Sequence, residues 1–418
     1  MSQVSALRAS GRVKVRTAEE PVMSQAKSLD GIVVLDVTQV MAGPYCAMLL
    51  SDMGARVIKV EPPDGDSTRA MAGARGGDNP AFGAVNRGKL GVVLDLSQEA
   101  GRDVFFRLAR QSDILIENFR PGVMKRLGLD YPTLALENPR LIYASISGFG
   151  QTGPDASRGG FDLVAQGMSG IMSVTGEPDG PPTKAGIPIT DLGAGLFALA
   201  GILAALHWRT ASGRGQHVDT SLFEAGLALS VWEATEYFSG RGVPARLGSA
   251  HRMVAPYQAV RCLDGHINIG AANDRTFTKV AGALGHPEWV TDERCASATA
   301  RVANRAALAD LIEAVTITRP RAEWTRVFDE AAVPCGPILD YAEAFAHPQA
   351  VARAMSVPVH HPRLGDSRAI GTPLKLSDTP LDPTRRAPML GEHTDEVLAA
   401  AGFSDDEIGQ LRAAGVAR

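Results

Sequence analysis

The chain has 418 residues, and its formal net charge at pH 7 is −4. That length allows a large hydrophobic core and two domains. The small negative charge gives no general attraction to nucleic acid or to an anionic membrane, so neither is expected as a partner. The four cysteines, Cys46, Cys262, Cys295 and Cys335, show no spacing typical of zinc sites or disulfide frameworks. We therefore expect reduced thiols, no metal site and a cytoplasmic protein.

The first thirty residues differ from the rest of the chain. They lack the hydrophobic region of a signal peptide. Met23-Ser-Gln repeats the opening Met1-Ser-Gln, which suggests a natural start near Met23. We expect residues 1–30 to be an extension without stable structure. Their scattered arginines also fit an organelle-targeting segment.

Short β-branched runs alternate with helical patterns over the first half of the chain. Strands are predicted at 31–36, 56–60, 92–95, 113–117 and 141–146, and helices at 45–53 and 99–110. This alternation predicts an α/β fold with a largely parallel sheet flanked by helices.

The second half begins with a long apolar helix. The predicted elements are a helix at 192–208, a strand at 217–221 and a helix at 223–237. The Gly- and Arg-rich stretch 239–255 is predicted to be a linker. Residues 256–344, with a strand pair around 264–265 and several helices, are predicted to form a smaller domain. Residues 345–418 are predicted to return and complete a large domain that begins at 31–238.

Asp191 is the only carboxylate at the start of the long, almost uncharged run 192–208. At the positive end of a helix an ionised carboxylate is favoured, and an ordinary pKa of about 3.9 leaves it charged at neutral pH. Asp191 is therefore available as a nucleophile, although plain helix capping is an alternative. The run is shorter than the roughly 20 residues that span a membrane and is rich in Gly and Ala, so we predict a core helix.

Gly148-Phe-Gly-Gln-Thr-Gly153 matches the dinucleotide-binding fingerprint and follows a predicted strand. A functional fingerprint opens a helix whose N-terminus binds the pyrophosphate. Here residues 154–160 continue as a loop. We therefore expect no nucleotide cofactor and predict that these glycines form a flexible active-site loop that helps to exclude water.

Several separated motifs carry a family resemblance. They include Glu117-Asn-Phe-Arg-Pro-Gly122 and Ile189-Thr-Asp191, together with 35–44, 54–61, 160–166, 210–216, 333–338 and 388–395. In this order they resemble the class III CoA-transferases, a family that includes formyl-CoA transferase, carnitine CoA-transferase and α-methylacyl-CoA racemase. The resemblance extends from residue 31 to residue 416. It implies a large Rossmann-like domain and a smaller α+β domain in an interlocked homodimer.

The resemblance also implies roles for individual residues. It makes Asp191 the catalytic nucleophile. The positions that it assigns to CoA binding are Val40, Ala42, Leu94, Asn118, Phe119 and Arg126. A planar guanidinium suits the phosphates of CoA, and a surface salt bridge is the alternative for Arg126. Met41 and Ser97 replace a glutamine and a lysine of formyl-CoA transferase, which argues against formate or oxalate as the acid.

The racemase members use a His–Asp pair to move the α-proton of an acyl-CoA. The position of that His is Phe161, which cannot exchange a proton, so we favour a transferase over a racemase or isomerase. For Asp162 we favour a structural role, binding backbone or capping the helix from 163, over proton transfer.

Residues 248–258 look closest to the succinyl-CoA:glutarate branch. His251 and Arg252 are predicted to bind the distal carboxylate of a dicarboxylic acid, with a solvated linker pair as the alternative. Gly159, Gly160 and Phe161 are also assigned to the substrate site. His360 and His361 lack a third ligand and are predicted to be surface histidines.

The sequence thus predicts a CoA-transferase that moves CoA from an acyl-CoA, with succinyl-CoA favoured, to a carboxylic acid, with a dicarboxylic acid favoured. The reaction would pass through an aspartyl anhydride and an aspartyl-CoA thioester at Asp191. CoA and acyl-CoA are expected as substrates, without a tightly bound cofactor. A CoA-binding paralogue without activity is the other alternative.

Overall fold

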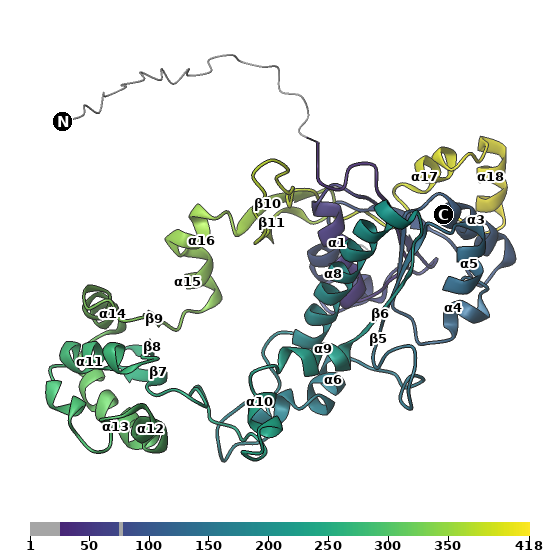
Figure 1. The fold of residues 1–418 in the computed structure, drawn as a ribbon. Helices are drawn as coiled ribbons and strands as arrows, with labels where there is room; N and C mark the ends of the chain where they lie inside the picture. Colours follow the sequence, from purple (N-terminus) through teal and green to yellow (C-terminus); the bar gives the residue numbers. More distant parts are fainter. Residues whose placement is uncertain (1–25, 75–77) are drawn as a thin grey trace, which may run out of the picture.

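The computed structural model describes residues 26–74 and 78–418, and Figure 1 shows the path of the chain. The predictions for residues 1–25 lie outside these described residues. Residues 28–31 form a turn, in which the Leu29 N–H donates a 3.0 Å hydrogen bond to the carbonyl oxygen of Met53. The chain is therefore attached to the body of the protein from this turn onward.

The main sheet has six strands in the order β3-β2-β1-β4-β5-β6, all parallel. The strands are β1 (Val33–Asp36), β2 (Arg56–Glu61), β3 (Leu90–Val93), β4 (Ile114–Glu117), β5 (Ile142–Ser147) and β6 (His217–Ser221). Each begins within two residues of a predicted strand, so the predicted α/β fold with a parallel sheet is confirmed. The strand order reverses between β1 and β4, which is the topological switch point of such a sheet.

Helices cover both faces of this sheet (Figure 1). On one face lie α1 (Ala42–Asp52) and α8 (Ile189–Ser212), and on the other lie α3 (Glu99–Arg110), α5 (Tyr131–Glu137), α17 (Thr394–Ala400) and α18 (Asp405–Ala413). Successive strand residues point to opposite faces, so Val34 packs with the first group and Leu35 with the second. Both side chains are fully buried.

The helix that carries Asp191 is longer than predicted. The run 192–208 becomes the 24-residue helix α8, because polar residues extend it at both ends, and the left-handed Gly213 ends it. In the described part of the chain it is the one helix long and apolar enough to cross a membrane by length and composition. It packs between α1, α9 (Leu222–Leu229), β5 and β6, which is the place of a core helix.

The predicted helix 223–237 is two helices, α9 and α10 (Ala234–Phe238). The Ser230 hydroxyl donates a 2.9 Å hydrogen bond to the carbonyl oxygen of Gly226. Such a side-chain bond competes with the helical backbone pattern. The chain therefore bends at 230–233.

A second unit has its own core. The antiparallel strands β7 (Tyr257–Cys262), β8 (Gly265–Gly270) and β9 (Cys335–Pro337) pack against α11 (Asp274–Ala283), α13 (Arg305–Thr316) and α14 (Arg321–Glu330). The strand pair predicted around 264–265 is confirmed as β7 and β8. Figure 1 shows this unit away from the parallel sheet.

Two segments connect the units (Figure 1). The first follows α10. The second runs through α15 (Tyr341–Ala346), α16 (Pro348–Ala352) and the hairpin of β10 (Ser356–His361) and β11 (Gly365–Ile370). The chain then returns to the main sheet, where Ala417 forms an antiparallel bridge with Leu94. The remaining helices are α2 (Pro80–Asn86), α4 (Val123–Arg126), α6 (Asp162–Met168), α7 (Ile171–Val174), α12 (Ala298–Ala303) and two 3-10 turns, Ser67–Ala70 and Pro287–Val290.

Candidate active site

Asp191 lies in the first turn of α8, but it does not cap the helix. The cap position is Pro188, and Asp191 is the third helical residue. The missing cap comes from Asp162, whose carboxylate accepts hydrogen bonds from the Thr190 N–H (3.0 Å) and hydroxyl (2.7 Å). The capping alternative for Asp191 is therefore wrong. Asp162 has the structural role that we favoured, although it caps α8 and not its own helix α6.

The Asp191 carboxylate is partly buried, and it has no hydrogen bond or ion pair with the residues that the structure describes. Burial raises its pKa to about 7, and the nearby charge of Asp162 adds to this rise. The expectation of an ordinary pKa was wrong, because desolvation and a second carboxylate outweigh the favourable helix end. With a pKa of about 7, about half of the Asp191 side chains are ionised at neutral pH, and the ionised form is poorly solvated.

A cavity of about 280 Å³ opens beside Asp191 at the carboxyl ends of the parallel strands. Its walls come from the segments that follow β1 and β4, from the end of β5 and from the first residue after β6. The lining residues of these segments include Gln39, Met41, Pro121, Ile146, Ser147, Gly148 and Leu222. Ligands of open α/β sheets bind at this edge near the switch point, so the topology and the cavity agree.

The cavity brings together most of the residues that the sequence assigned to the site. Val40, Ala42, Asn118, Phe119, Gly159, Gly160 and Phe161 all line it together with Asp191. Two assigned residues lie elsewhere: Leu94 is buried in the core, and Arg126 is exposed at the end of α4. The Arg126 guanidinium has no ion pair with any described residue, so the surface salt bridge considered for it is not observed.

His251 and Arg252 do not line the Asp191 cavity. They border a separate cavity of about 230 Å³ together with Val174, Glu233 and Tyr257. The Arg252 guanidinium forms a 3.1 Å ion pair with Glu236, and the His251 ring lies between those of Trp232 and Tyr257. Within one chain, Arg252 is therefore bound to Glu236 and His251 contacts two aromatic rings, and neither residue lines the Asp191 cavity.

Sequence reasoning missed two cationic residues of the cavity, Arg120 and Arg158. Arg120 follows Phe119 within a motif that was recognised, so its place in that motif is a signal that could have identified it. Its guanidinium has no ion pair with a described residue. Arg158 forms a 3.1 Å ion pair with the half-buried Asp155. Arg120 thus gives the cavity wall a positive charge that suits anionic substrates.

The loop from Gly148 to Phe161 closes on itself beside the cavity. A Cβ atom added to Gly148 would lie 2.8 Å from the Cα of Gly160, so the two backbones touch and neither position accepts a side chain. No helix begins before Asp162, nine residues after Gly153. The prediction of a loop here is confirmed, and the dinucleotide fingerprint lacks its helix.

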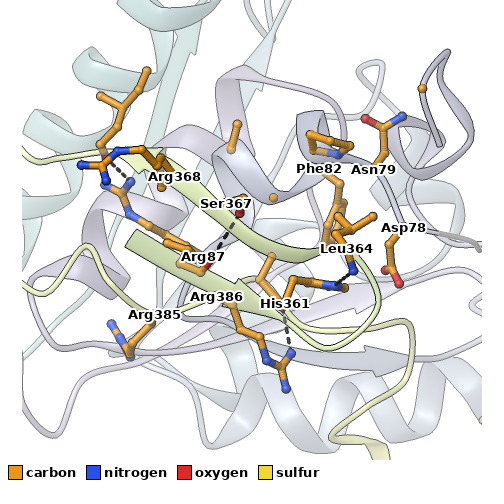
Figure 2. A pocket seen from close by; sticks show the side chains of 18 residues that line it. Asp78, Asn79, Phe82, Arg87, His361, Leu364, Ser367, Arg368, Arg385 and Arg386 are labelled. Carbon is orange, nitrogen blue, oxygen red and sulfur yellow. Dashed lines mark hydrogen bonds between the residues drawn. The ribbon is translucent and has the colours of Figure 1, made fainter. Parts of the chain in front are cut away.

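Another cavity, of about 410 Å³, lies between α2 and the β10–β11 hairpin (Figure 2). Several arginines line it, but Arg87 forms a 2.6 Å ion pair with Asp52 and Arg386 pairs with Glu392. Among the described residues, its one lining carboxylate, Asp78, forms a 3.0 Å ion pair with the buried Arg69. We therefore do not place the reaction here.

His361 lines this second cavity and corrects a prediction. It is buried, whereas a surface residue was expected. Its Nδ1 atom accepts hydrogen bonds from the N–H groups of Arg363 and Leu364, both at 3.2 Å, and so fixes the hairpin turn. His360 is exposed beside Asp366. Among the described residues, no group of three or more His, Cys, Asp or Glu is placed to hold a metal ion.

Comparison with known proteins matches residues 29–394 to CoA-transferase family III. The chain belongs to this family. It is 44% identical to an acetyl-CoA:oxalate CoA-transferase of Acetobacter aceti, over 87% of this chain and 93% of the relative. It is 40% identical to a succinate–glutarate CoA-transferase of Agrobacterium fabrum, over 89% and 95%. A solved CAIB/BAIF family protein from Brucella suis is 40% identical, with a TM-score of 0.80 over 90% of this chain and 100% of that chain.

These findings make the chain a CoA-transferase, for which CoA thioesters are substrates. The named relatives act on different acids, oxalate in one case and succinate and glutarate in the other. Identity to the oxalate enzyme is at least as high as to the glutarate enzyme. The argument from Met41 and Ser97 against oxalate therefore stays a prediction.

The raised pKa of Asp191 predicts how this CoA-transferase responds to pH. The folded protein binds the proton more tightly than the unfolded chain, so this carboxyl loses stabilising free energy as the pH rises from about 4 to 7. Asp191→Asn, which cannot ionise, should raise the Tm at pH 8 by roughly 1–3 °C. The gain should shrink as the pH falls towards 4. Calorimetry against the exposed control Asp103→Asn checks this, and a lower Tm of Asp191→Asn at pH 8 would contradict it.

Proposed function

We propose that this CoA-transferase moves CoA from succinyl-CoA to a dicarboxylic acid such as glutarate, by covalent catalysis at Asp191. The observation that carries the proposal is a partly buried carboxylate, without an ion-pair partner among the described residues, on the wall of a cavity at the switch point of the sheet. A carboxylate that is poorly solvated and unpaired attacks an electrophilic carbonyl more readily than one held in an ion pair.

The reaction has two matching halves. An oxygen of Asp191 attacks the thioester carbonyl, the C–S bond breaks, and an acyl–aspartyl anhydride and CoA thiolate form. The thiolate attacks the aspartyl carbonyl, which releases the donor acid and leaves an aspartyl-CoA thioester. The acceptor carboxylate then attacks that thioester, the C–S bond breaks, and an acceptor–aspartyl anhydride and CoA thiolate form. The thiolate attacks the acceptor's carbonyl and displaces the Asp191 carboxylate. The products are a new acyl-CoA and free Asp191, and no net proton is taken up or released.

Oxyanions that form in these steps need hydrogen-bond donors. Helix α1 begins at Ala42, its cap residue Met41 provides no side-chain cap, and both residues line the cavity. Gly195 allows α8 to approach α1 closely, because a Cβ there would lie 2.7 Å from the carbonyl oxygen of Ala42. We propose that the N–H groups of Met41, Ala42 and Gly43 stabilise the oxyanions, since Pro44, the third residue of α1, has no N–H.

We propose that CoA is bound by the residues that the family resemblance assigned to it. Val40, Ala42, Asn118 and Phe119 would contact the part of CoA near the thioester. Arg126, exposed and without an ion-pair partner among the described residues, would bind a phosphate from outside the cavity. Leu94 is the least supported of the set, since its side chain is buried in the core.

The loop from Gly148 to Phe161 would exclude water, which would otherwise hydrolyse the anhydride and the thioester. Gly159, Gly160 and Phe161 place this loop on the cavity wall. Phe161 has no ionisable group, so the α-proton exchange of a racemase lacks its acid/base partner at this position.

Product analysis with a panel of acids tests the function. Wild-type protein with succinyl-CoA should form glutaryl-CoA faster than oxalyl-CoA or formyl-CoA. Asp191→Asn should lower the rate by about 10³-fold or more, since it removes the nucleophile. Below pH 7 the wild-type rate should fall about tenfold per pH unit as Asp191 becomes protonated. Deuterium entering a 2-methylacyl-CoA, without transfer to any acid, would instead indicate an isomerase.

The same panel tests the assigned substrate pair. Arg252→Met should raise the KM for glutarate about tenfold and leave that for acetate unchanged, because only glutarate has a distal carboxylate. Arg246→Met is a matched control from the same linker, where the guanidinium binds the carbonyl oxygen of Gly180. If Arg252→Met changed the KM for glutarate and for acetate equally, the proposal that Arg252 binds the distal carboxylate would be contradicted.

We also propose a homodimer, interlocked as in the family, with 31–238 and 345–418 as the large domain, 239–255 as a linker and 256–344 as the small domain. Large apolar side chains are exposed on three neighbouring helices: Phe197 and Trp208 of α8, Leu227 and Leu229 of α9, and Phe238 of α10. A second copy would cover them. Sedimentation should give twice the 44.0 kDa of one chain. A mass of one chain would contradict the dimer.

We also propose that the enzyme is located in the cytoplasm. All four cysteines are free thiols, and three of them are buried. A reducing compartment keeps such thiols from oxidation. Cell fractionation checks this placement.

A further inference from the structure

The segment between β1 and α1 holds a strained residue on the wall of the Asp191 cavity. Val40 has a φ of +69°, in the left-handed region that a β-branched residue rarely adopts. Such a conformation persists only where the surroundings fix it, and it often occurs at functional sites. Val40, Met41 and Ala42 line the cavity in succession.

A buried ion pair fixes Val40. Its N–H donates to the Asp66 carboxylate at 3.3 Å, and Asp66 also accepts a 3.1 Å hydrogen bond from Lys59 Nζ. The ammonium group of Lys59 donates in addition to the carbonyl oxygen of Thr38. The side chains of Lys59 and Asp66 are both fully buried. Neither residue lines the cavity.

The two residues before Val40 are fixed in the same way. The Asn118 amide accepts from the Gln39 N–H (2.8 Å) and donates to the Gln39 carbonyl oxygen (2.7 Å). Thr38 donates through its N–H to Asp36 at 2.9 Å, and Asp36 pairs with the buried Lys89. Side chains, most of them distant in the sequence, thus bind backbone groups of three consecutive residues, Thr38, Gln39 and Val40.

The two buried ion pairs at this turn are weak evidence for a gain in stability. Taking both charges out of water offsets most of their attraction, and apolar residues often stabilise a fold as well. The pairs do, however, provide donors and acceptors for backbone groups that would otherwise be unpaired. Their contribution is therefore to the conformation of the turn.

We propose that the Lys59–Asp66 pair is a positioning device for CoA transfer: it holds Val40 left-handed and so fixes the backbone of Met41 and Ala42 beside Asp191. The inference rests on the proposed function, in which those backbone groups stabilise the oxyanions. Lys59 and Asp66 act through Val40 and do not touch the substrate.

Replacing both members of the pair tests the device. Lys59→Met with Asp66→Ala leaves no isolated buried charge and should fold. Its kcat for CoA transfer should fall at least about tenfold, while the KM for acyl-CoA changes less than about threefold. Amide exchange of 38–42, followed by mass spectrometry, should become at least about tenfold faster. Adding Val40→Gly should recover a good part of kcat, because glycine adopts this φ without strain.

A matched control removes a similar pair elsewhere. Asp52 and Arg87 form a buried ion pair at the other end of α1, about 15 Å along the helix from Ala42. Asp52→Ala with Arg87→Met should lower the Tm and leave both kcat and the exchange of 38–42 unchanged.

Two results would overturn the inference. Wild-type exchange at 38–42 without the Lys59–Asp66 pair would show that the pair does not hold the turn. Faster exchange with an unchanged kcat would show that the turn's conformation does not matter for transfer. A wild-type protein that transfers CoA to no acid would contradict the proposed function instead, and the exchange measurement would still decide whether the pair holds Val40.

Discussion

One electrostatic constraint governs the site: the Asp191 carboxylate is partly buried and has no cation at ion-pair distance among the described residues. Burial and the charge of Asp162 raise its pKa to about 7, although it stands at the favourable end of α8. An ion pair would stabilise this carboxylate but would also reduce its nucleophilicity. The structure instead uses Asp162 to cap α8 through Thr190, which leaves Asp191 free of any capping role.

The rest of the fold positions the Asp191 carboxylate and the groups around it. The parallel sheet places the ends of four strands around Asp191, and α8 packs directly on α1 because Gly195 lacks a side chain. The start of α1 then lies beside the carboxylate, with backbone N–H groups available for a developing negative charge. Buried charges beneath the turn at Val40 fix its shape. The paired charges of Lys59, Asp66, Lys89 and Asp36 are thus in the interior, and the unpaired carboxylate of Asp191 lines the cavity.

Much of this could be predicted from the sequence, for identifiable reasons. Alternating β-branched runs and helical patterns predicted the parallel sheet, because fully buried strands such as β4 leave a strong local signal. The motifs that carry the family resemblance supplied most residues of the cavity wall. The raised pKa of Asp191 could not be predicted, since it depends on burial and on Asp162, which is 29 positions earlier in the sequence. The left-handed backbone conformation of Val40 could not be predicted either, because it depends on contacts with Asp66 and Lys59. The buried His361 and the break at Ser230 likewise follow from local contacts that a pattern of residue types does not contain.

Transfer of oxygen from the acceptor acid to Asp191 is the most direct test of covalent catalysis. In the proposed mechanism an acceptor oxygen attacks the aspartyl-CoA thioester, and that oxygen stays on Asp191 when the thiolate takes the acyl group. After a single turnover with succinyl-CoA and ¹⁸O-labelled glutarate, mass spectrometry of the peptide containing Asp191 should show one ¹⁸O atom in its carboxyl group, and further turnovers should add a second. Transfer of CoA with no ¹⁸O in that peptide would contradict the account.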